Sequence, residues 1–267
     1  MSRLPALARS AIFVLAFGFA GALIMLFALQ RQMIYPGTGP DDGSWNAPPP
    51  GYETVELHTA DKLALRALYR APKPGGKVLI FFHGNGDSAL NSAFSLAPVL
   101  GEADGALMMS YRGYAGNPGQ PSEEGLYADA DAGLAYLRSR GIEDSRIVIG
   151  GFSLGTGVAS QLATKGEFAG LLLIAPFTAL SDVAAEHFPW VPTSLLMRDR
   201  YLTRDRLKTG APLLIVHGKR DGIIPVSHAR RLAKLRDDAR LELFDNATHN
   251  DVSAIASQTM RDWMAGL

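Results

Sequence analysis

The chain contains no cysteine in its 267 residues. Disulfide bonds, a thiolate nucleophile, thiolate metal sites and a lipid-modified cysteine are therefore excluded. An excess of one charge is also absent, because 26 Lys and Arg balance 26 Asp and Glu, so no basic field points to nucleic acid. The patterns Gly-x-x-x-x-Gly-Lys-Ser/Thr, Gly-x-Gly-x-x-Gly and His-Glu-x-x-His do not occur. We expect no nucleic-acid partner, no cofactor and no metal.

One long apolar run stands near the N-terminus. Nineteen uncharged residues extend from Ala11 to Leu29, and at about 1.5 Å per residue they match the ~30 Å hydrocarbon layer of a bilayer. We therefore expect an uncleaved membrane anchor over residues 1–34. The alternatives are a signal peptide cleaved near Ala20-Gly21-Ala22, beyond which apolar residues continue, and a core helix, which fits poorly with a segment apolar on every face.

Charge around this run predicts its orientation. Arg3 and Arg9 precede it, with the terminal amine, whereas only Arg31 follows closely. By the positive-inside tendency we expect a single-pass protein with a cytoplasmic N-terminus and the remaining chain on the outer, periplasmic or extracytoplasmic side. Residues 35–52 are rich in Pro, Gly and Asp, which predicts a linker. Its aromatic residues Tyr35 and Trp45 are expected either at the membrane interface or in a loop docked on the following domain.

Strand and helix signals alternate over residues 53–267. Two short runs, Val55 to Thr59 and Leu65 to Tyr69, indicate an antiparallel hairpin. Apolar runs typical of buried strands follow at 77–82, 106–109, 147–149, 171–175, 213–216 and 241–244. Helical segments are expected at 88–100, 122–138, 154–164, 227–236 and 251–264. This alternation predicts one α/β domain, a mostly parallel eight-stranded sheet with helices on both faces.

A candidate nucleophile follows the 147–149 strand. Gly151-Phe152-Ser153-Leu154-Gly155 matches Gly-x-Ser-x-Gly and leads into small, helix-compatible residues. In such a nucleophile elbow a tight turn lifts the serine into strained geometry, and the flanking glycines let backbone and helix approach closely. The pentapeptide alone is a weak signal, so its place between a strand and a helix carries the prediction that Ser153 is a nucleophile.

A nucleophilic serine needs a general base. Of the six histidines, His249 lies in a polar loop after the last predicted strand, where the carboxyl ends of parallel strands gather functional residues. We therefore expect His249 to be the base. The others are expected to have surface, packing or backbone-binding roles: His58, His83, His187, His217 and His228.

The base in turn needs an acceptor that holds its tautomer. Asp221, in the loop after the 213–216 strand, is the expected acid, with Asp182 and Asp245 as alternatives. The resulting order of serine, acid and histidine is that of α/β-hydrolases. For the oxyanion hole we expect the backbone N–H groups of Leu154 and of Asn85, in the loop after the 77–82 strand; an ordinary glycine-rich turn is the alternative for the latter.

Further motifs accompany the serine pentapeptide along the domain: Phe82-His-Gly-Asn-Gly86, the run from Tyr111 to Asp129, Pro176-Phe-Thr178, His217-Gly-x-x-Asp221-x-x-x-Pro225 and His249-Asn250. With them the chain from about residue 53 onward resembles α/β-hydrolases of the Bem46 type. It is also similar to α/β-hydrolase domain-containing proteins 13 and 17 and to serine aminopeptidase-like hydrolases. The resemblance implies an α/β-hydrolase fold with Ser153 as nucleophile, Asp221 as acid, His249 as base, and Asn85 with Leu154 as oxyanion hole.

Two residues depart from the pattern of these hydrolases. Thr248 stands where a glycine commonly precedes the histidine, and Ser110 where an acidic or amide residue usually precedes Tyr-Arg-Gly. The first could alter the loop that holds His249, and neither removes a reacting group. Arg112 is expected to form an ion pair inside the 111–129 loop, with a substrate carboxylate as the alternative partner.

The sequence thus predicts a membrane-anchored serine hydrolase that cleaves carboxylic esters or thioesters through an acyl-enzyme. The alternatives are amide or peptide cleavage, and a non-catalytic hydrolase-fold scaffold, against which the retained serine, acid and histidine argue. Apolar residues between 176 and 208 indicate either a small cap with an acyl pocket or helices packed on the sheet. We expect a monomer acting on a small molecule, a lipid or an acylated protein.

Overall fold

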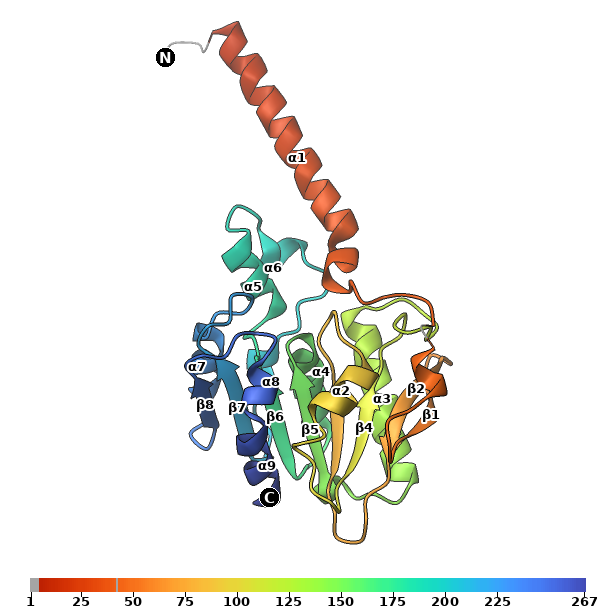
Figure 1. Cartoon of the computed structure of the whole chain (residues 1–267). Helices are drawn as coiled ribbons and strands as arrows, with labels where there is room; N and C mark the ends of the chain where they lie inside the picture. Colours follow the sequence, from red (N-terminus) through yellow and green to blue (C-terminus); the bar gives the residue numbers. More distant parts are fainter. Residues whose placement is uncertain (1–4, 42) are drawn as a thin grey trace.

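The computed structural model describes residues 5–41 and 43–267. Helix α1, Ala6–Ile34, stands away from an α/β domain that contains the rest of the described chain (Figure 1). The domain carries eight strands: β1 Glu53–His58, β2 Ala64–Arg70, β3 Val78–Phe82, β4 Gly105–Met109, β5 Ile147–Phe152, β6 Gly170–Ile174, β7 Leu213–Gly218 and β8 Arg240–Phe244.

All eight strands form one sheet in the order β1-β2-β4-β3-β5-β6-β7-β8. Strand β2 is antiparallel to both of its neighbours, and the other neighbouring pairs are parallel. The predicted hairpin and the predicted mostly parallel sheet are therefore confirmed. Strands β3 to β7 are buried along nearly their whole length, as their continuous apolar runs require.

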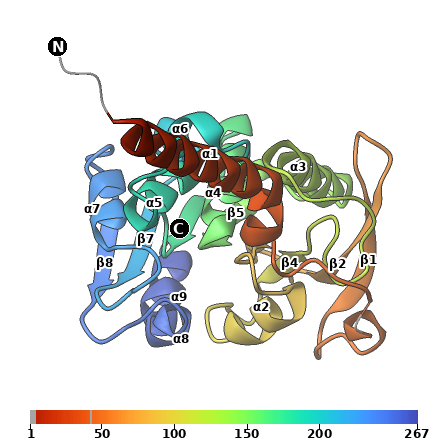
Figure 2. The same cartoon turned by 90° about the horizontal axis from the view of Figure 1, so that it is seen from above.

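Helices cover both faces of the sheet (Figure 2). Alternate strand residues point to opposite faces, so Ile80 packs with α3 and α4 whereas Leu79 packs with α2 and α9. The helices are α2 Ala89–Ser95, α3 Glu123–Ser139, α4 Leu154–Leu162, α5 Leu180–His187, α6 Thr193–Leu196, α7 Ser227–Ala233, α8 Val252–Ile255 and α9 Ser257–Ala265. Four short 3-10 turns, η1 to η4, occur at Ser44–Asn46, Asp144–Arg146, Ala163–Lys165 and Thr203–Asp205.

Helices α4 and α7 end two and three residues before the predicted positions 164 and 236, and two further predicted helices differ more. The helix predicted at 88–100 ends at Ser95 because Pro98 lacks an N–H and disfavours helical geometry at Ala97. The helix predicted at 251–264 is divided into α8 and α9 at Ala256, a fully buried residue. Neither change moves a strand, so the sheet keeps the predicted arrangement.

Helix α1 is longer than the predicted span. Among the described residues, Ile12–Ile34 form a helix that is long and apolar enough to cross a membrane. Near its end, Gln30 is buried, but the most apolar stretch of the helix is not buried inside the domain. A core helix is therefore excluded, and a membrane anchor and a signal sequence are both consistent with its length and composition. Arg3, used above to predict orientation, lies outside the described residues.

The segment after α1 docks on the domain. Tyr35 and Trp45 are both buried, the Trp45 indole N–H donates to the Ala115 carbonyl at 2.8 Å, and Thr38 forms a β-bridge with Tyr114. Of the two arrangements expected for these aromatic residues, the docked loop is the one that the structure has. The segment thereby places the end of α1 beside the carboxyl ends of the parallel strands (Figure 1).

Candidate active site

Ser153 occupies a sharp turn between β5 and α4. Its backbone has φ 50° and ψ −117°, a strained combination for a residue with a side chain. The turn needs glycine on either side: a Cβ on Gly155 would lie 1.9 Å from the Phe82 carbonyl oxygen, and one on Gly151 would lie 2.3 Å from that of Gly155. The sequence pattern Gly-x-Ser-x-Gly therefore has a steric cause in this structure.

Ser153, His249 and Asp221 form one hydrogen-bonded row. Ser153 Oγ lies 3.0 Å from His249 Nε2, and His249 Nδ1 lies 2.7 Å from Asp221 Oδ2. The other oxygen of Asp221 accepts hydrogen bonds from the N–H groups of Ile223 and Ile224, each at 2.8 Å. All three side chains of the row are largely buried, which strengthens the electrostatic interactions between them.

The surroundings of Asp221 keep its carboxyl group ionised. Burial alone would raise its pKa, but the hydrogen bond and charge interaction with His249, with the N–H groups of Ile224 and Ile223, hold the pKa below the ordinary value of 3.8. His217 Nε2 lies 3.8 Å from Asp221. Burial lowers the pKa of His217 below 6.5, so this neighbour is neutral at pH 7. A carboxylate therefore faces His249 across the neutral pH range.

The two alternative acids make other contacts. Asp182 accepts a hydrogen bond from the Thr178 hydroxyl at 2.6 Å and pairs with Arg204. Asp245 pairs with Lys219 and is mostly exposed. The carboxylate that contacts His249 is that of Asp221.

The remaining histidines have the kinds of surroundings expected from the sequence. Nδ1 of His83 lies 2.6 Å from the Gly84 carbonyl oxygen, and Nδ1 of His217 lies 2.9 Å from that of Gly218. His58 is exposed and His228 is buried beside Thr178. His187 differs in lining the cavity described below, where its Nε2 lies 2.9 Å from the Ile223 carbonyl oxygen.

Two backbone N–H groups are available near Ser153. Leu154 is the first residue of α4, where N–H groups have no partner within a helix. Asn85 lies in the loop after β3, and its carbonyl oxygen accepts hydrogen bonds from the Tyr114 hydroxyl at 2.9 Å and the Gly37 N–H at 3.2 Å. In the described part of the chain neither the Leu154 nor the Asn85 N–H donates to another backbone group, so both are available to an oxyanion.

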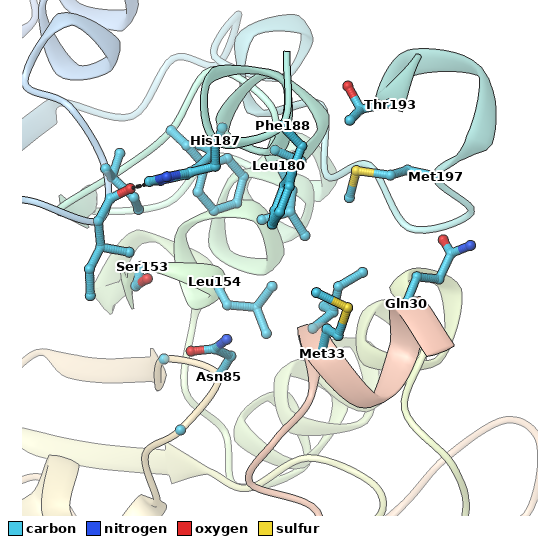
Figure 3. A pocket seen from close by; sticks show the side chains of 18 of the residues that line it. Gln30, Met33, Asn85, Ser153, Leu154, Leu180, His187, Phe188, Thr193 and Met197 are labelled. Atoms are coloured by element: carbon cyan, nitrogen blue, oxygen red, sulfur yellow. Dashed lines mark hydrogen bonds between the residues drawn. The ribbon is translucent and has the colours of Figure 1, made fainter. Parts of the chain in front are cut away.

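A cavity of about 660 Å³ opens above Ser153 and His249 (Figure 3). Its lining is mostly apolar and comes from the last turns of α1, the α5–α6 region, the turn between β5 and α4, and the loops after β3, β6, β7 and β8. The contribution of α1 was not expected from the sequence. The one available signal was the pair Gln30 and Arg31, polar residues directly after the apolar run.

The residues that depart from the hydrolase pattern are accommodated. Thr248 is not among the described residues with positive φ, so glycine is not required there, and its N–H donates to the Asp251 carboxylate at 2.6 Å. The Ser110 carbonyl oxygen accepts a hydrogen bond from the Asn117 side chain. Arg112 forms ion pairs with Asp61 and with buried Asp129, so the predicted internal ion pair exists.

Metal-ligand residues do not gather in the described ranges 5–41 and 43–267, where no group of three or more His, Cys, Asp or Glu side chains could hold an ion. The residues at and beneath the cavity floor combine a hydroxyl, an imidazole, a carboxylate and two N–H groups without a backbone partner, a set that can perform acyl transfer. This set, at the carboxyl ends of the strands of an eight-stranded sheet, defines the α/β-hydrolase class.

Comparison with known proteins agrees with this class, and the chain belongs to the alpha/beta hydrolase family. The profile of that family matches residues 79–209. A Mycobacterium tuberculosis protein described as uncharacterized is 34% identical over 256 residues, which cover 93% of this chain and 90% of that protein. Protein bem46 of Schizosaccharomyces pombe is 29% identical over 264 residues, with 92% of this chain and 86% of that protein covered. The resemblance to Bem46-type hydrolases is therefore confirmed.

A solved structure gives the same result. The alpha-beta hydrolase from Vibrio vulnificus superposes with a TM-score of 0.67 and 25% sequence identity, over 82% of each chain.

Proposed function

We propose that the protein is a serine hydrolase that cleaves carboxylic ester or thioester bonds through an acyl-enzyme. The observation that carries the proposal is the hydrogen-bonded row of Ser153, His249 and Asp221 at the floor of an apolar cavity. A hydroxyl 3.0 Å from an imidazole that contacts an ionised carboxylate has the arrangement needed for nucleophilic attack at neutral pH.

In the proposed reaction, Ser153 Oγ attacks the carbonyl carbon while His249 Nε2 takes the hydroxyl proton. The bond to the alcohol or thiol then breaks, and this leaving group takes the proton from His249. Water, deprotonated by His249, next attacks the acyl-serine. The bond from the acyl carbon to Ser153 Oγ then breaks, and Oγ takes the proton from His249, which gives a carboxylic acid and free Ser153. Asp221 holds the Nδ1 proton of His249 and stabilises the imidazolium that forms in both steps.

The N–H groups of Leu154 and Asn85 are proposed to bind the oxyanion of both tetrahedral intermediates. Leu154 adds the positive end of the α4 dipole at the point where negative charge develops. Asn85 is held by two hydrogen bonds on its carbonyl side, from Tyr114 and Gly37. Such prior fixation lowers the reorganisation needed during the reaction.

The location of the enzyme is a separate proposal. We propose that α1 is an uncleaved single-pass anchor, with the N-terminus in the cytoplasm and the hydrolase domain on the outer side. The length of Ile12–Ile34 and the lack of burial of its most apolar stretch support a membrane span, and the arginines that precede it support the orientation. A monomer is sufficient for this activity, because the whole row and both N–H groups come from one chain.

An active-site-directed fluorophosphonate probe tests the proposed nucleophile. We expect wild type to be labelled and Ser153→Ala to be unlabelled, because the probe phosphonylates an activated serine. Ser139→Ala, at an exposed serine at the end of α3, is the matched control and is expected to keep the label. A folded wild-type protein that takes no label would favour the non-catalytic scaffold, and a labelled Ser153→Ala would move the nucleophile elsewhere.

A further inference from the structure

The last turns of α1 are a wall of the active-site cavity. Leu26, Phe27, Gln30, Met33 and Ile34 line it, opposite the α5–α6 region. Figure 3 shows Met33 on the α1 side of the same space that Leu154 and Asn85 border. A helix that only tethered the domain would not need to contact this space. The expected membrane segment and the candidate catalytic site therefore share a surface.

Polar contacts fix α1 in this position. The Gln30 side chain accepts a hydrogen bond from the Arg198 N–H at 2.8 Å and donates to the Leu196 carbonyl oxygen at 3.3 Å. Arg31 makes a bidentate ion pair with Asp199, at 2.9 Å and 3.1 Å. Bidentate pairs define orientation as well as distance. The end of α1 is thereby held to the residues that follow α6.

Apolar surface continues from α1 onto the region over the cavity. Trp190 is 51% exposed and Leu195 is 83% exposed, and the ring of Trp190 lies 6.0 Å from that of Phe19 on α1. Exposed apolar side chains next to an expected membrane span are typical of a surface that enters the bilayer interface, where Trp is enriched. The cavity thus lies between a membrane span and a second apolar surface on the same side of the domain.

The residues that line the cavity favour an uncharged, apolar part of a substrate. Neither Lys nor Arg is among the described residues that line it, and Asp87 is the lining carboxylate. An anionic head group would find no cation there, whereas an uncharged hydrocarbon chain would contact mainly apolar side chains. Ser153 and His249 are among the residues that line this apolar space. A long acyl chain with its carbonyl carbon at Ser153 fits both features.

We propose that the substrate is a long-chain acyl ester or thioester held in the bilayer, whose chain passes between α1 and the α5–α6 region to reach Ser153. Helix α1 is then part of the acyl-binding site as well as the anchor. This proposal rests on the serine hydrolase function proposed above. Its distinct content is that residues of the membrane helix determine the preferred acyl length.

Two matched substitutions on α1 test this role. Met33→Trp narrows the cavity, whereas Met25→Trp changes an exposed residue of the same helix that does not line it. With p-nitrophenyl esters in detergent micelles, we expect Met33→Trp to lower the ratio of dodecanoate to butyrate kcat/KM by about tenfold, as for the loss of a few methylene contacts. Met25→Trp is expected to keep the wild-type ratio. An unchanged ratio in Met33→Trp, or the same change in both variants, would overturn the proposal.

The wild-type protein supplies a test that needs no variant to fold. Its kcat/KM is expected to rise with acyl length from butyrate to dodecanoate, and a profile that falls or stays flat would contradict the acyl site. If butyrate is hydrolysed but kcat/KM falls or stays flat with acyl length, the serine hydrolase function is still supported and only the acyl site is contradicted. If no ester is hydrolysed and Ser153 takes no fluorophosphonate, the proposed function itself fails.

Reconstituted vesicles test the entry route and distinguish the source of the acyl group. With a monoacylglycerol in one set of vesicles and an S-acylated peptide in another, we expect faster hydrolysis when enzyme and substrate share a vesicle than when they occupy separate ones. Preference between the two substrates identifies the lipid ester or the protein thioester as the source. Equal rates in shared and separate vesicles would exclude entry from the bilayer.

Discussion

Ser153 has a conformation that few residues other than glycine adopt. The cost of such backbone strain is about 1–3 kcal/mol, and the packing of Gly151 and Gly155 against neighbouring carbonyls maintains it. The strain aims Oγ at His249 rather than at the backbone of α4. The proposed catalysis therefore depends on the side chains of Ser153, His249 and Asp221, whose roles can be separated by substitution.

Asp221→Asn and His249→Ala are each expected to reduce ester turnover by on the order of 10³-fold or more. The first removes the charge that holds the tautomer of His249, and the second removes the base. Steady-state kinetics on a short-chain ester, with circular dichroism to establish folding, measures both effects. Turnover close to that of wild type in folded Asp221→Asn would transfer the acid role to Asp182 or Asp245.

These residues could be predicted from the sequence because each follows a strand. Ser153 comes after β5, Asp221 after β7 and His249 after β8, and the carboxyl ends of parallel strands meet at one edge. The ends of apolar runs are visible in the chain. Distances between side chains are not visible there, so Asp182 and Asp245 stayed open as alternatives to Asp221 until the structure showed which carboxylate contacts His249.

At the scale of elements, the segment after α1 supports the loop that carries Asn85. The Gly37 N–H bonds the Asn85 carbonyl oxygen, and a Cβ on Gly37 would lie 2.4 Å from the Tyr114 ring and 2.9 Å from that oxygen. The sequence did not predict this contact, because it joins residues of a Pro- and Gly-rich segment to a loop about fifty positions away. Composition indicates an irregular segment without indicating what it touches.

Gly37→Ala is therefore expected to displace the Asn85 loop and to lower kcat, by up to about 10²-fold, the effect of losing one oxyanion donor. Gly39→Ala is the matched control: a Cβ there meets nothing within 4 Å, so its kcat should equal that of wild type. Kinetics of both variants on one ester gives the comparison. Equal kcat values for the two variants would remove the segment from the proposed oxyanion site.

Arg112 supports the fold of the loop between β4 and α3. Its guanidinium pairs at 2.7 Å with Asp129, which is 0% exposed. Arg112→Met would remove the charged partner of that buried carboxylate and leave it the Arg112 backbone N–H at 2.9 Å, at an expected cost of about 3–5 kcal/mol in the free energy of unfolding. Lys73→Met, at an exposed pair with Glu102, should leave the free energy of unfolding nearly unchanged. Denaturant titration in detergent compares them, and similar losses would argue against a special role for Arg112.

Over the whole molecule, helix α1 and the α/β domain together line one cavity. The apolar run and the domain were both visible in the sequence, since each depends on local pattern. The position of the apolar helix relative to the domain was not visible in the sequence, because it depends on long-range contacts such as Arg31 with Asp199 and Tyr35 with Tyr201. These contacts direct the cavity toward α1 and so toward the expected bilayer.

The orientation of the whole chain in the membrane gives a prediction independent of catalysis. Because positive residues are in excess before the apolar run, a reporter fused after Leu267 should be active outside the cytoplasm. Two reporters, one active on each side of the membrane, provide the measurement and its control. Activity confined to the cytoplasmic reporter would reverse the orientation without changing the proposed chemistry.

The proposed ester cleavage passes through an acyl group on Ser153. After brief incubation with an activated ester, acid quench and trypsin digestion, mass spectrometry should find the acyl group on the peptide that follows Arg146 and ends at Lys165. The adduct should be absent from Ser153→Ala, which should also lack turnover. Ester turnover with no adduct on this peptide, or turnover retained in Ser153→Ala, would contradict the proposed acyl-enzyme.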